Sequence, residues 1–174
     1  MEHGRGEYGR ALALMTEALP TLESEDRLYA VGVVGCWRWH FFTDEGAETQ
    51  LREGMRYYDS AWASLGHLLV ATDRADQGHR TFVDGVAAGN LMCMLPLANR
   101  LAEQGDRDAA EQLYRRAFQL GDAYSAWNLS LLFEREGREE EAASWLWKAA
   151  QAGDEDAVRA LAEDSEVDDT DGVG

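Results

Sequence analysis

The chain has 174 residues, of which 45% are hydrophobic, and its 33 acidic and 16 basic side chains give a formal net charge of −17. This length suffices for a folded domain with an apolar core, and the apolar content excludes an intrinsically disordered chain. The charge argues against binding to nucleic acid or to an anionic membrane surface, because Lys and Arg must neutralise the negative charges of both.

The composition favours helices and free thiols. Only two prolines occur, Pro20 and Pro96, whereas the good helix formers Ala, Leu, Glu and Arg are abundant. Cys36 and Cys93 each lie in an apolar run outside any CxxC pair, which predicts buried thiols in a reducing compartment.

We find neither a signal-type apolar segment nor a stretch long enough to span a bilayer, so we expect a cytoplasmic protein.

The first third of the chain predicts three helices with an imperfect pattern. Residues 8–19 have the apolar spacing of the second helix of a hairpin whose first helix is missing. Residues 27–42 and 44–57 then form a first and a second helix. We therefore expect an N-terminal capping helix in residues 1–24 and a degenerate hairpin repeat in residues 25–56.

From residue 57 onward a pattern recurs every 32 residues. Gly-Asn or Gly-Asp pairs and one leucine ladder keep this step: Gly89-Asn90, Gly121-Asp122, Gly153-Asp154, and Leu65, Leu97, Leu129, Leu161. Glycine favours the left-handed conformation that ends a helix, and Asn or Asp caps the start of the next helix. The pattern predicts three hairpin repeats, in residues 57–88, 89–120 and 121–152. A C-terminal capping helix is expected in residues 153–163, followed by an acidic, disordered tail in residues 164–174.

The hairpin of residues 121–152 shows the helical spacing best. Its first helix carries Ala126, Leu129 and Phe133 at intervals of three and four, which places them on one face. Its second helix is expected to bury Ala142, Trp145, Leu146 and Ala149. One hairpin cannot bury both of its faces, so the hairpins are expected to stack into an all-α solenoid.

One run resembles the tetratricopeptide-repeat (TPR) pattern W-x2-L-G-x2-Y, with leucine at the last place: Trp62-Ala63-Ser64-Leu65-Gly66-His67-Leu68-Leu69. Ala110-x3-Tyr114 is similar to the A-x3-F element of the family. The closing proline of the family is absent, and the Ala-x3-Gly-Asp endings at residues 117–122 and 149–154 are similar to the Sel1-like branch. The resemblance implies a right-handed α–α superhelix of stacked antiparallel hairpins with about nine or ten helices.

No residue pattern points to catalysis or to a bound cofactor. The four histidines lack metal-ligand partners at helical spacing, and HExxH, phosphate-loop and GxSxG motifs are absent. We therefore expect no catalytic residues, no metal and no cofactor. An enzyme built on a helical scaffold stays open as an alternative, because a fold does not determine a function.

The resemblance also implies a partner-binding groove, because the first helices of such repeats line the concave face. The repeat register projects six residues into this groove: His67, Asn99, Tyr124, Trp127, Leu131 and Arg135. The alternative for Tyr124 and Trp127 is packing against the next hairpin. We expect the groove to bind a peptide or partner segment, with a basic one favoured by the net charge.

Two further expectations concern partners. The alternative to an interaction scaffold is that this chain is an acidic regulatory or inhibitory protein that occupies a basic site on its partner. Trp145 and Trp147 lie on the last full second helix, and one of them is expected to be exposed. An exposed indole there would give a surface for homo-oligomerisation.

Overall fold

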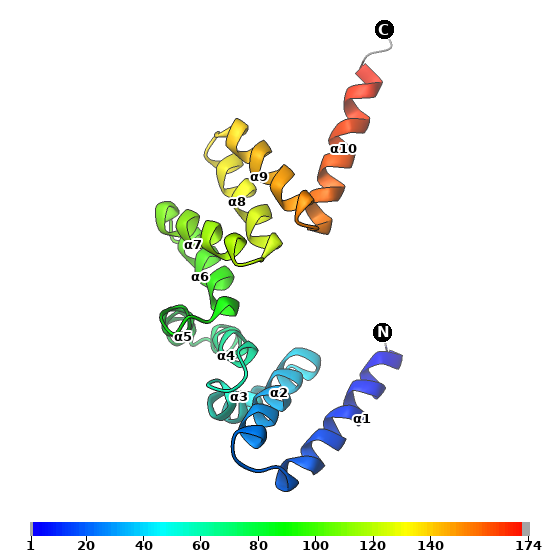
Figure 1. Ribbon diagram of the computed structural model, residues 1–174, viewed down its shortest axis with the longest axis vertical. Coiled ribbons are helices and arrows are strands. Elements are labelled where there is room, and N and C mark those ends of the chain that lie inside the picture. The colour runs from blue at the N-terminus through cyan, green and yellow to red at the C-terminus, as the bar shows by residue number, and fades with distance from the viewer. Residues whose placement is uncertain (1, 172–174) are drawn as a thin grey trace. The chain divides into compact units, whose positions relative to one another are not determined.

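The computed structural model describes residues 2–171, and within them it contains helices and turns but no strand (Figure 1). The α-helices are α1 (Glu2–Ala18), α2 (Ser24–Phe42), α3 (Glu48–Gly54), α4 (Ser60–Ala71), α5 (Ala75–Ala87), α6 (Met94–Glu103), α7 (Arg107–Gln119), α8 (Ala123–Arg135), α9 (Glu139–Gln151) and α10 (Glu155–Asp171). Three short 3-10 helices accompany them, η1 (Leu19–Thr21), η2 (Glu45–Ala47) and η3 (Leu91–Cys93). The predicted all-α class is confirmed. None of the described helices is both long enough and apolar enough to cross a membrane.

The chain divides into two compact units, the N-terminal unit up to Pro96 and the C-terminal unit from Leu97 onward. The boundary falls within α6, so the predicted repeat of residues 89–120 begins in one unit and ends in the other. Each unit is described by itself.

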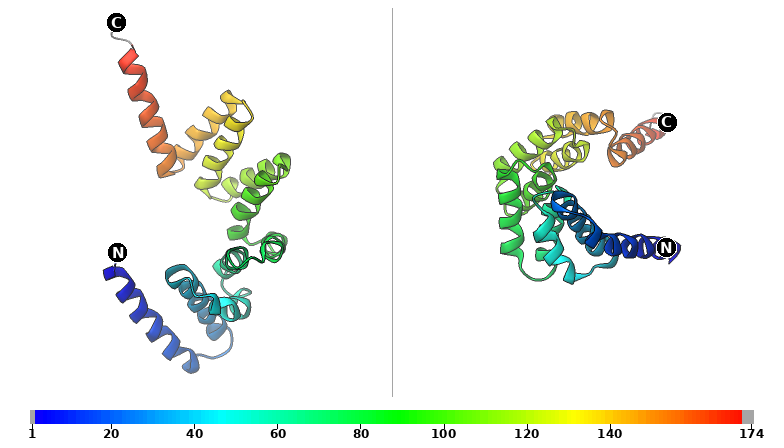
Figure 2. Two further views of the ribbon diagram at one scale, coloured as in Figure 1. Left: turned by 180° about the vertical axis from the view of Figure 1, so that it is seen from behind. Right: turned by 60° about the horizontal axis from the view of Figure 1, so that its bottom comes forward.

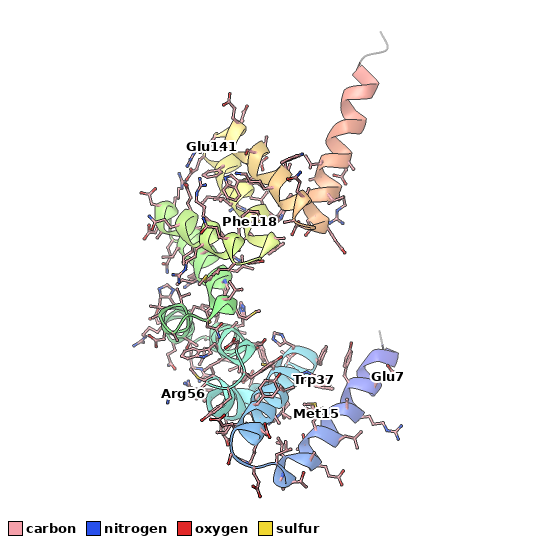
Figure 3. All side chains as sticks on the ribbon, viewed as in Figure 1. Glu7, Met15, Trp37, Arg56, Phe118 and Glu141 are labelled. Atoms are coloured by element: carbon pink, nitrogen blue, oxygen red, sulfur yellow. The ribbon has the colours of Figure 1, made fainter. Side chains whose placement is uncertain are left out.

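In the N-terminal unit, α2 pairs with α3 and α4 pairs with α5, and α4 packs against both helices of the preceding hairpin. Its core contains the fully buried side chains Leu51, Leu65, Leu68 and Leu69. Helix α1 packs against α2 through Tyr8, whose ring stacks on Phe41 at 4.0 Å and meets Trp37 edge to face. Trp37 lies on the side of α2 that faces α1 (Figure 3).

A glycine pair brings α2 and α3 into close contact. A Cβ atom on Gly54 of α3 would lie 2.2 Å from the Cα atom of Gly32 on α2. This spacing leaves no room for any side chain, so the two backbones touch directly. Leu51, one turn before Gly54, is completely buried as a result.

In the C-terminal unit, α8 and α9 form a hairpin whose helices lie side by side in every view (Figure 2). Helix α7 packs against α8, and α10 packs against α9. Phe133 is the largest completely buried side chain, and the Arg138 guanidinium lies over its ring at 4.0 Å. Phe118 of α7 and Trp145 of α9 meet edge to face at 5.4 Å, which ties the outer helices together.

The glycines that close the helices adopt the predicted left-handed conformation. Gly121 and Gly153 have φ angles of +100° and +92°, and each following Asp N–H donates to a carbonyl five residues back. Asp154 also accepts a hydrogen bond from the Ala157 N–H at 2.9 Å, as an N-cap does. The interpretation of Gly-Asp as a helix stop followed by a helix start is therefore confirmed at residues 153–154.

The end of the chain differs from the prediction. Helix α10 continues to Asp171, whereas a disordered tail is predicted from residue 164; residues 172–174 lie outside the described residues. Neither glycine nor proline occurs between Gly153 and Gly172, so no residue that favours a helix end interrupts this segment.

Candidate functional site

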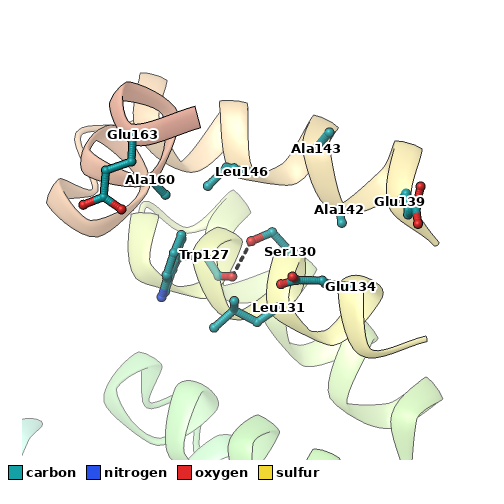
Figure 4. A pocket seen from close by; sticks show the side chains of 10 residues that line it. All are labelled: Trp127, Ser130, Leu131, Glu134, Glu139, Ala142, Ala143, Leu146, Ala160 and Glu163. Atoms are coloured by element: carbon teal, nitrogen blue, oxygen red, sulfur yellow. Dashed lines mark hydrogen bonds between the residues drawn. The ribbon is translucent and has the colours of Figure 1, made fainter. Parts of the chain in front are cut away.

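Helices α8, α9 and α10 enclose an open cleft of about 520 Å³ within the C-terminal unit (Figure 4). Helix α8 contributes one wall, α9 the opposite wall, and α10 closes one end. The lining residues are Trp127, Ser130, Leu131, Glu134, Glu139, Ala142, Ala143, Leu146, Ala160 and Glu163. The walls are therefore mainly apolar, and every charged lining residue is a glutamate.

The packing of α8 and α9 explains why this space stays open. Trp145 and Ala149 are buried and hold α9 in the hairpin. The prediction that Ala142 and Leu146 share this buried stripe is wrong, because both are only half-buried and line the cleft instead. The alanines on the α9 wall are too small to fill the gap opposite Trp127, so a cavity remains.

The three glutamates of the cleft, Glu134, Glu139 and Glu163, are exposed and form no ion pair with any described residue. The neighbouring cation, Arg138, bonds other carboxylates instead: Glu111, Glu136 and Glu141. Its hydrogen bonds hold the pKa of Glu141 below the ordinary value. The cleft therefore keeps three uncompensated negative charges.

Three of the predicted groove residues, Asn99, Tyr124 and Arg135, lie near Tyr114 of α7. The Tyr114 hydroxyl donates to Asn99 Oδ1 at 2.7 Å. Burial raises the pKa of Tyr114 to about 12; the nearby charge of Arg135 opposes this shift, and Tyr124 adds to it. Tyr124 is 44% exposed, so the described residues do not enclose its side chain.

Trp127 and Leu131 are both half-buried and line the cleft. Together with Tyr124 and Arg135 they follow one another along α8 at helical spacing, which we call the α8 stripe. The structure thus brings five of the six predicted residues together in the C-terminal unit, four on this stripe and Asn99 beside it.

No family model matches the sequence. An F-box protein of Arabidopsis thaliana, At1g70590, is 31% identical over 80 residues, which are 45% of this chain and 23% of the relative. The matched part thus spans less than a quarter of that protein.

Solved structures resemble most of the chain. The crystal structure of MamA superimposes with a TM-score of 0.62 at 15% identity, covering 90% of this chain and 94% of MamA. YrrB, described as a TPR protein with an unusual peptide-binding site, gives a TM-score of 0.58 at 19% identity, covering 90% of this chain and 84% of YrrB. The chain has the TPR fold. The predicted repeat solenoid is confirmed, and the Sel1-like character of the repeat endings stays a prediction.

The sixth predicted groove residue, His67, belongs to the N-terminal unit. Its ring meets Phe82 edge to face at 5.2 Å, and its side chain reaches solvent. Desolvation by surrounding atoms, and secondly the charge of His40, lower the pKa of His67. The pKa of His40 is also lowered, because its ring is partly desolvated between α2 and α4.

His40 belongs to a short polar chain in the N-terminal unit. Its Nε2 atom lies 2.9 Å from Ser64 Oγ, and the Ser64 hydroxyl donates to Cys36 Sγ at 3.3 Å. Ser64 is only 1% exposed, which closes its hydroxyl to a substrate. The serine and histidine therefore connect two helices, and the arrangement gives no support to nucleophilic catalysis.

We expect thermal stability to decrease when the pH falls from 7.5 to 5.5. The folded chain favours neutral His40 and His67, whereas histidines of the unfolded chain take up protons near pH 6.5. This contribution is complete above about pH 6.5 and is lost as the pH falls below it. Glu48, whose pKa is lowered, acts only at more acidic pH. Melting followed by circular dichroism measures the effect.

The control for this prediction is the double variant His40→Gln/His67→Gln. It should show a smaller difference in melting temperature between the two pH values than the wild-type chain. An unchanged difference would show that other groups cause the pH dependence.

Sequence reasoning missed the α9 and α10 walls of the cleft and its three glutamates. Among the described side chains, no group of three His, Cys, Asp or Glu is arranged to hold a metal ion. The two cysteines are buried free thiols, and burial raises the pKa of Cys93 to about 12.

Proposed function

We propose that the chain is a non-catalytic interaction scaffold that binds a protein segment on the α8 stripe and in the adjoining cleft. The single observation that carries the proposal is the position of Trp127, half-buried on a wall of an open, mainly apolar cleft. Aromatic side chains in such positions supply much of the affinity of protein interfaces. The peptide-binding site of YrrB, which has the same fold, supports this proposal.

The lining of the cleft favours binding over catalysis. It includes neither histidine nor cysteine nor lysine, and its one hydroxyl, Ser130 Oγ, donates to the Trp127 carbonyl at 2.7 Å. A nucleophile with an adjacent base is thus missing among the lining residues. The cleft is also open to solvent, which suits a protein segment better than a metabolite that must be enclosed.

The test uses peptides selected on the full chain by display of a random library. We expect Trp127→Ala to weaken the binding of selected peptides at least about tenfold, as is typical when an interface tryptophan is removed. Isothermal titration calorimetry measures the affinity, and circular dichroism checks that the variant is folded.

The matched control is Trp147→Ala, since Trp147 is 56% exposed on α9 and does not line the cleft. This variant should bind the same peptides with nearly wild-type affinity. If selection yields no peptide, or if the folded Trp127→Ala variant binds as tightly as the wild-type chain, the proposal is wrong.

A further inference from the structure

We infer that the segment bound in the cleft carries two cationic side chains, one at each end of an apolar stretch. This inference rests on the proposed function of the same cleft. It concerns the chemistry of the partner, which the proposed function leaves open.

The carboxylates occupy opposite ends of the cleft (Figure 4). Glu163 of α10 lies at one end, near Trp127, whereas Glu134 and Glu139 lie toward the other end, where α8 turns into α9. The side chains between these ends are apolar, Leu131, Ala142, Ala143 and Leu146, apart from Ser130, whose hydroxyl is taken up by the Trp127 carbonyl. An occupant that matches this order has an apolar middle and a positive charge at either end.

The glutamates are free to pair with an incoming cation. Arg138 is held by three other carboxylates, and neither lysine nor arginine lines the cleft. The net charge of −17 adds a long-range attraction for a basic segment. A neutral segment would leave the three carboxylates without partners, and an acidic segment would in addition be repelled by the chain as a whole.

The shape of a basic side chain also suits this site. Lysine and arginine can lay their methylene groups along an apolar wall while the charged group reaches the rim. At the Glu163 end a guanidinium can also stack on the indole of Trp127. We therefore expect arginine to be preferred at that end, because it pairs with a carboxylate and stacks on an aromatic ring at once.

The experiment starts from a synthetic peptide whose binding depends on Trp127. Five versions share its length and apolar middle and differ only in the two flanking residues: Arg/Arg, Arg/Gln, Gln/Arg, Gln/Gln and Glu/Glu. Each loss of an arginine should weaken binding to the full chain about two- to fivefold, as expected for exposed ion pairs. The advantage of the Arg/Arg peptide should shrink at high salt, which screens such pairs.

Variants of the chain then assign the two ends. Glu163→Gln should remove the preference for arginine at one flank only, and Glu134→Gln/Glu139→Gln should remove it at the other. Glu163→Arg should bind better to a peptide with glutamate at the matching flank, a rescue that a purely structural role of Glu163 would not produce. Glu140→Gln is the control, since Glu140 is exposed at the start of α9 but lies outside the cleft.

The outcomes separate this inference from the proposed function. If the Gln/Gln peptide binds as tightly as the Arg/Arg peptide while Trp127→Ala still weakens both, the inference fails and the scaffold proposal stands. A selection that yields no peptide dependent on Trp127 overturns both.

Discussion

Replacing Phe133 by alanine is expected to lower the free energy of unfolding by about 3–5 kcal/mol, the usual loss for a buried phenylalanine. Its side chain is completely buried in the C-terminal unit, so alanine would leave a cavity between α8 and its neighbours. The change also removes the ring beneath the guanidinium of Arg138, which lies 4.0 Å away. Urea denaturation followed by far-UV circular dichroism measures the loss.

Trp147→Ala is the matched control, because it removes an aromatic side chain of the same unit that is 56% exposed. It should change the free energy of unfolding by no more than about 0.5 kcal/mol. Equal effects of the two substitutions would contradict the assigned core.

Gly54→Ala is expected to destabilise the N-terminal unit by about 1–3 kcal/mol, as overpacking does. The added Cβ would lie 2.2 Å from Gly32 Cα and 2.3 Å from Gly32 N, and neither backbone atom can rotate away. Helices α2 and α3 would have to separate, which would expose Leu51. The same denaturation measurement detects this change.

Gly6→Ala serves as the control, because it is expected to raise the free energy of unfolding rather than lower it. Gly6 lies in α1, and nothing lies within 4 Å of its added Cβ. Alanine there should stabilise the helix by about 0.5–1 kcal/mol, because it restricts the unfolded chain more than glycine does. A stabilisation of similar size at both positions would mean that helix propensity, rather than the contact with Gly32, governs Gly54, and would contradict the prediction.

The repeat could be predicted because equivalent positions in successive hairpins are buried in the same way and therefore keep the same kind of residue. Leu65 and Leu129 are 1% and 0% exposed, as the leucine ladder predicts, and Leu97 is 6% exposed. Leu161 departs from the ladder and is only half-buried. Helix α10, which carries it, packs against α9, and the described residues include no second helix that would pair with α10 and cover Leu161. Of the two tryptophans on α9, Trp145 is buried and Trp147 is exposed, which confirms that one of them reaches solvent.

The unpaired glutamates of the cleft could not be predicted, because the turn between α8 and α9 decides which arginines they can reach. In sequence, Glu134 and Arg138 stand four residues apart, as do Arg135 and Glu139, a spacing that favours ion pairs within one helix. Gly137 ends α8 with a φ angle of +71°, so neither pair forms in the structure. Arg138 bonds carboxylates elsewhere, and the glutamates remain at the cleft.

The part of the groove prediction that depends on spacing within one helix matches the geometry of α8, whereas partner binding there stays a prediction. Tyr124, Trp127, Leu131 and Arg135 share a face of α8, as the helical period requires. The walls supplied by α9 and α10 depend on tertiary packing, in which small residues such as Ala142 and Ala160 leave space that no sequence period records.

The left-handed glycines at the ends of the helices have a consequence for how such a protein can change in length. A Cβ atom on Gly89, Gly121 or Gly153 would meet nothing within 4 Å, so each of these corners faces open space. A tandem duplication or deletion whose breakpoints fall at these corners would add or remove 32 residues while leaving every helix whole. The new junction would have the same Gly-Asn or Gly-Asp sequence as the corners that the chain already contains. A repeat can therefore be gained or lost without creating a new kind of connection between helices.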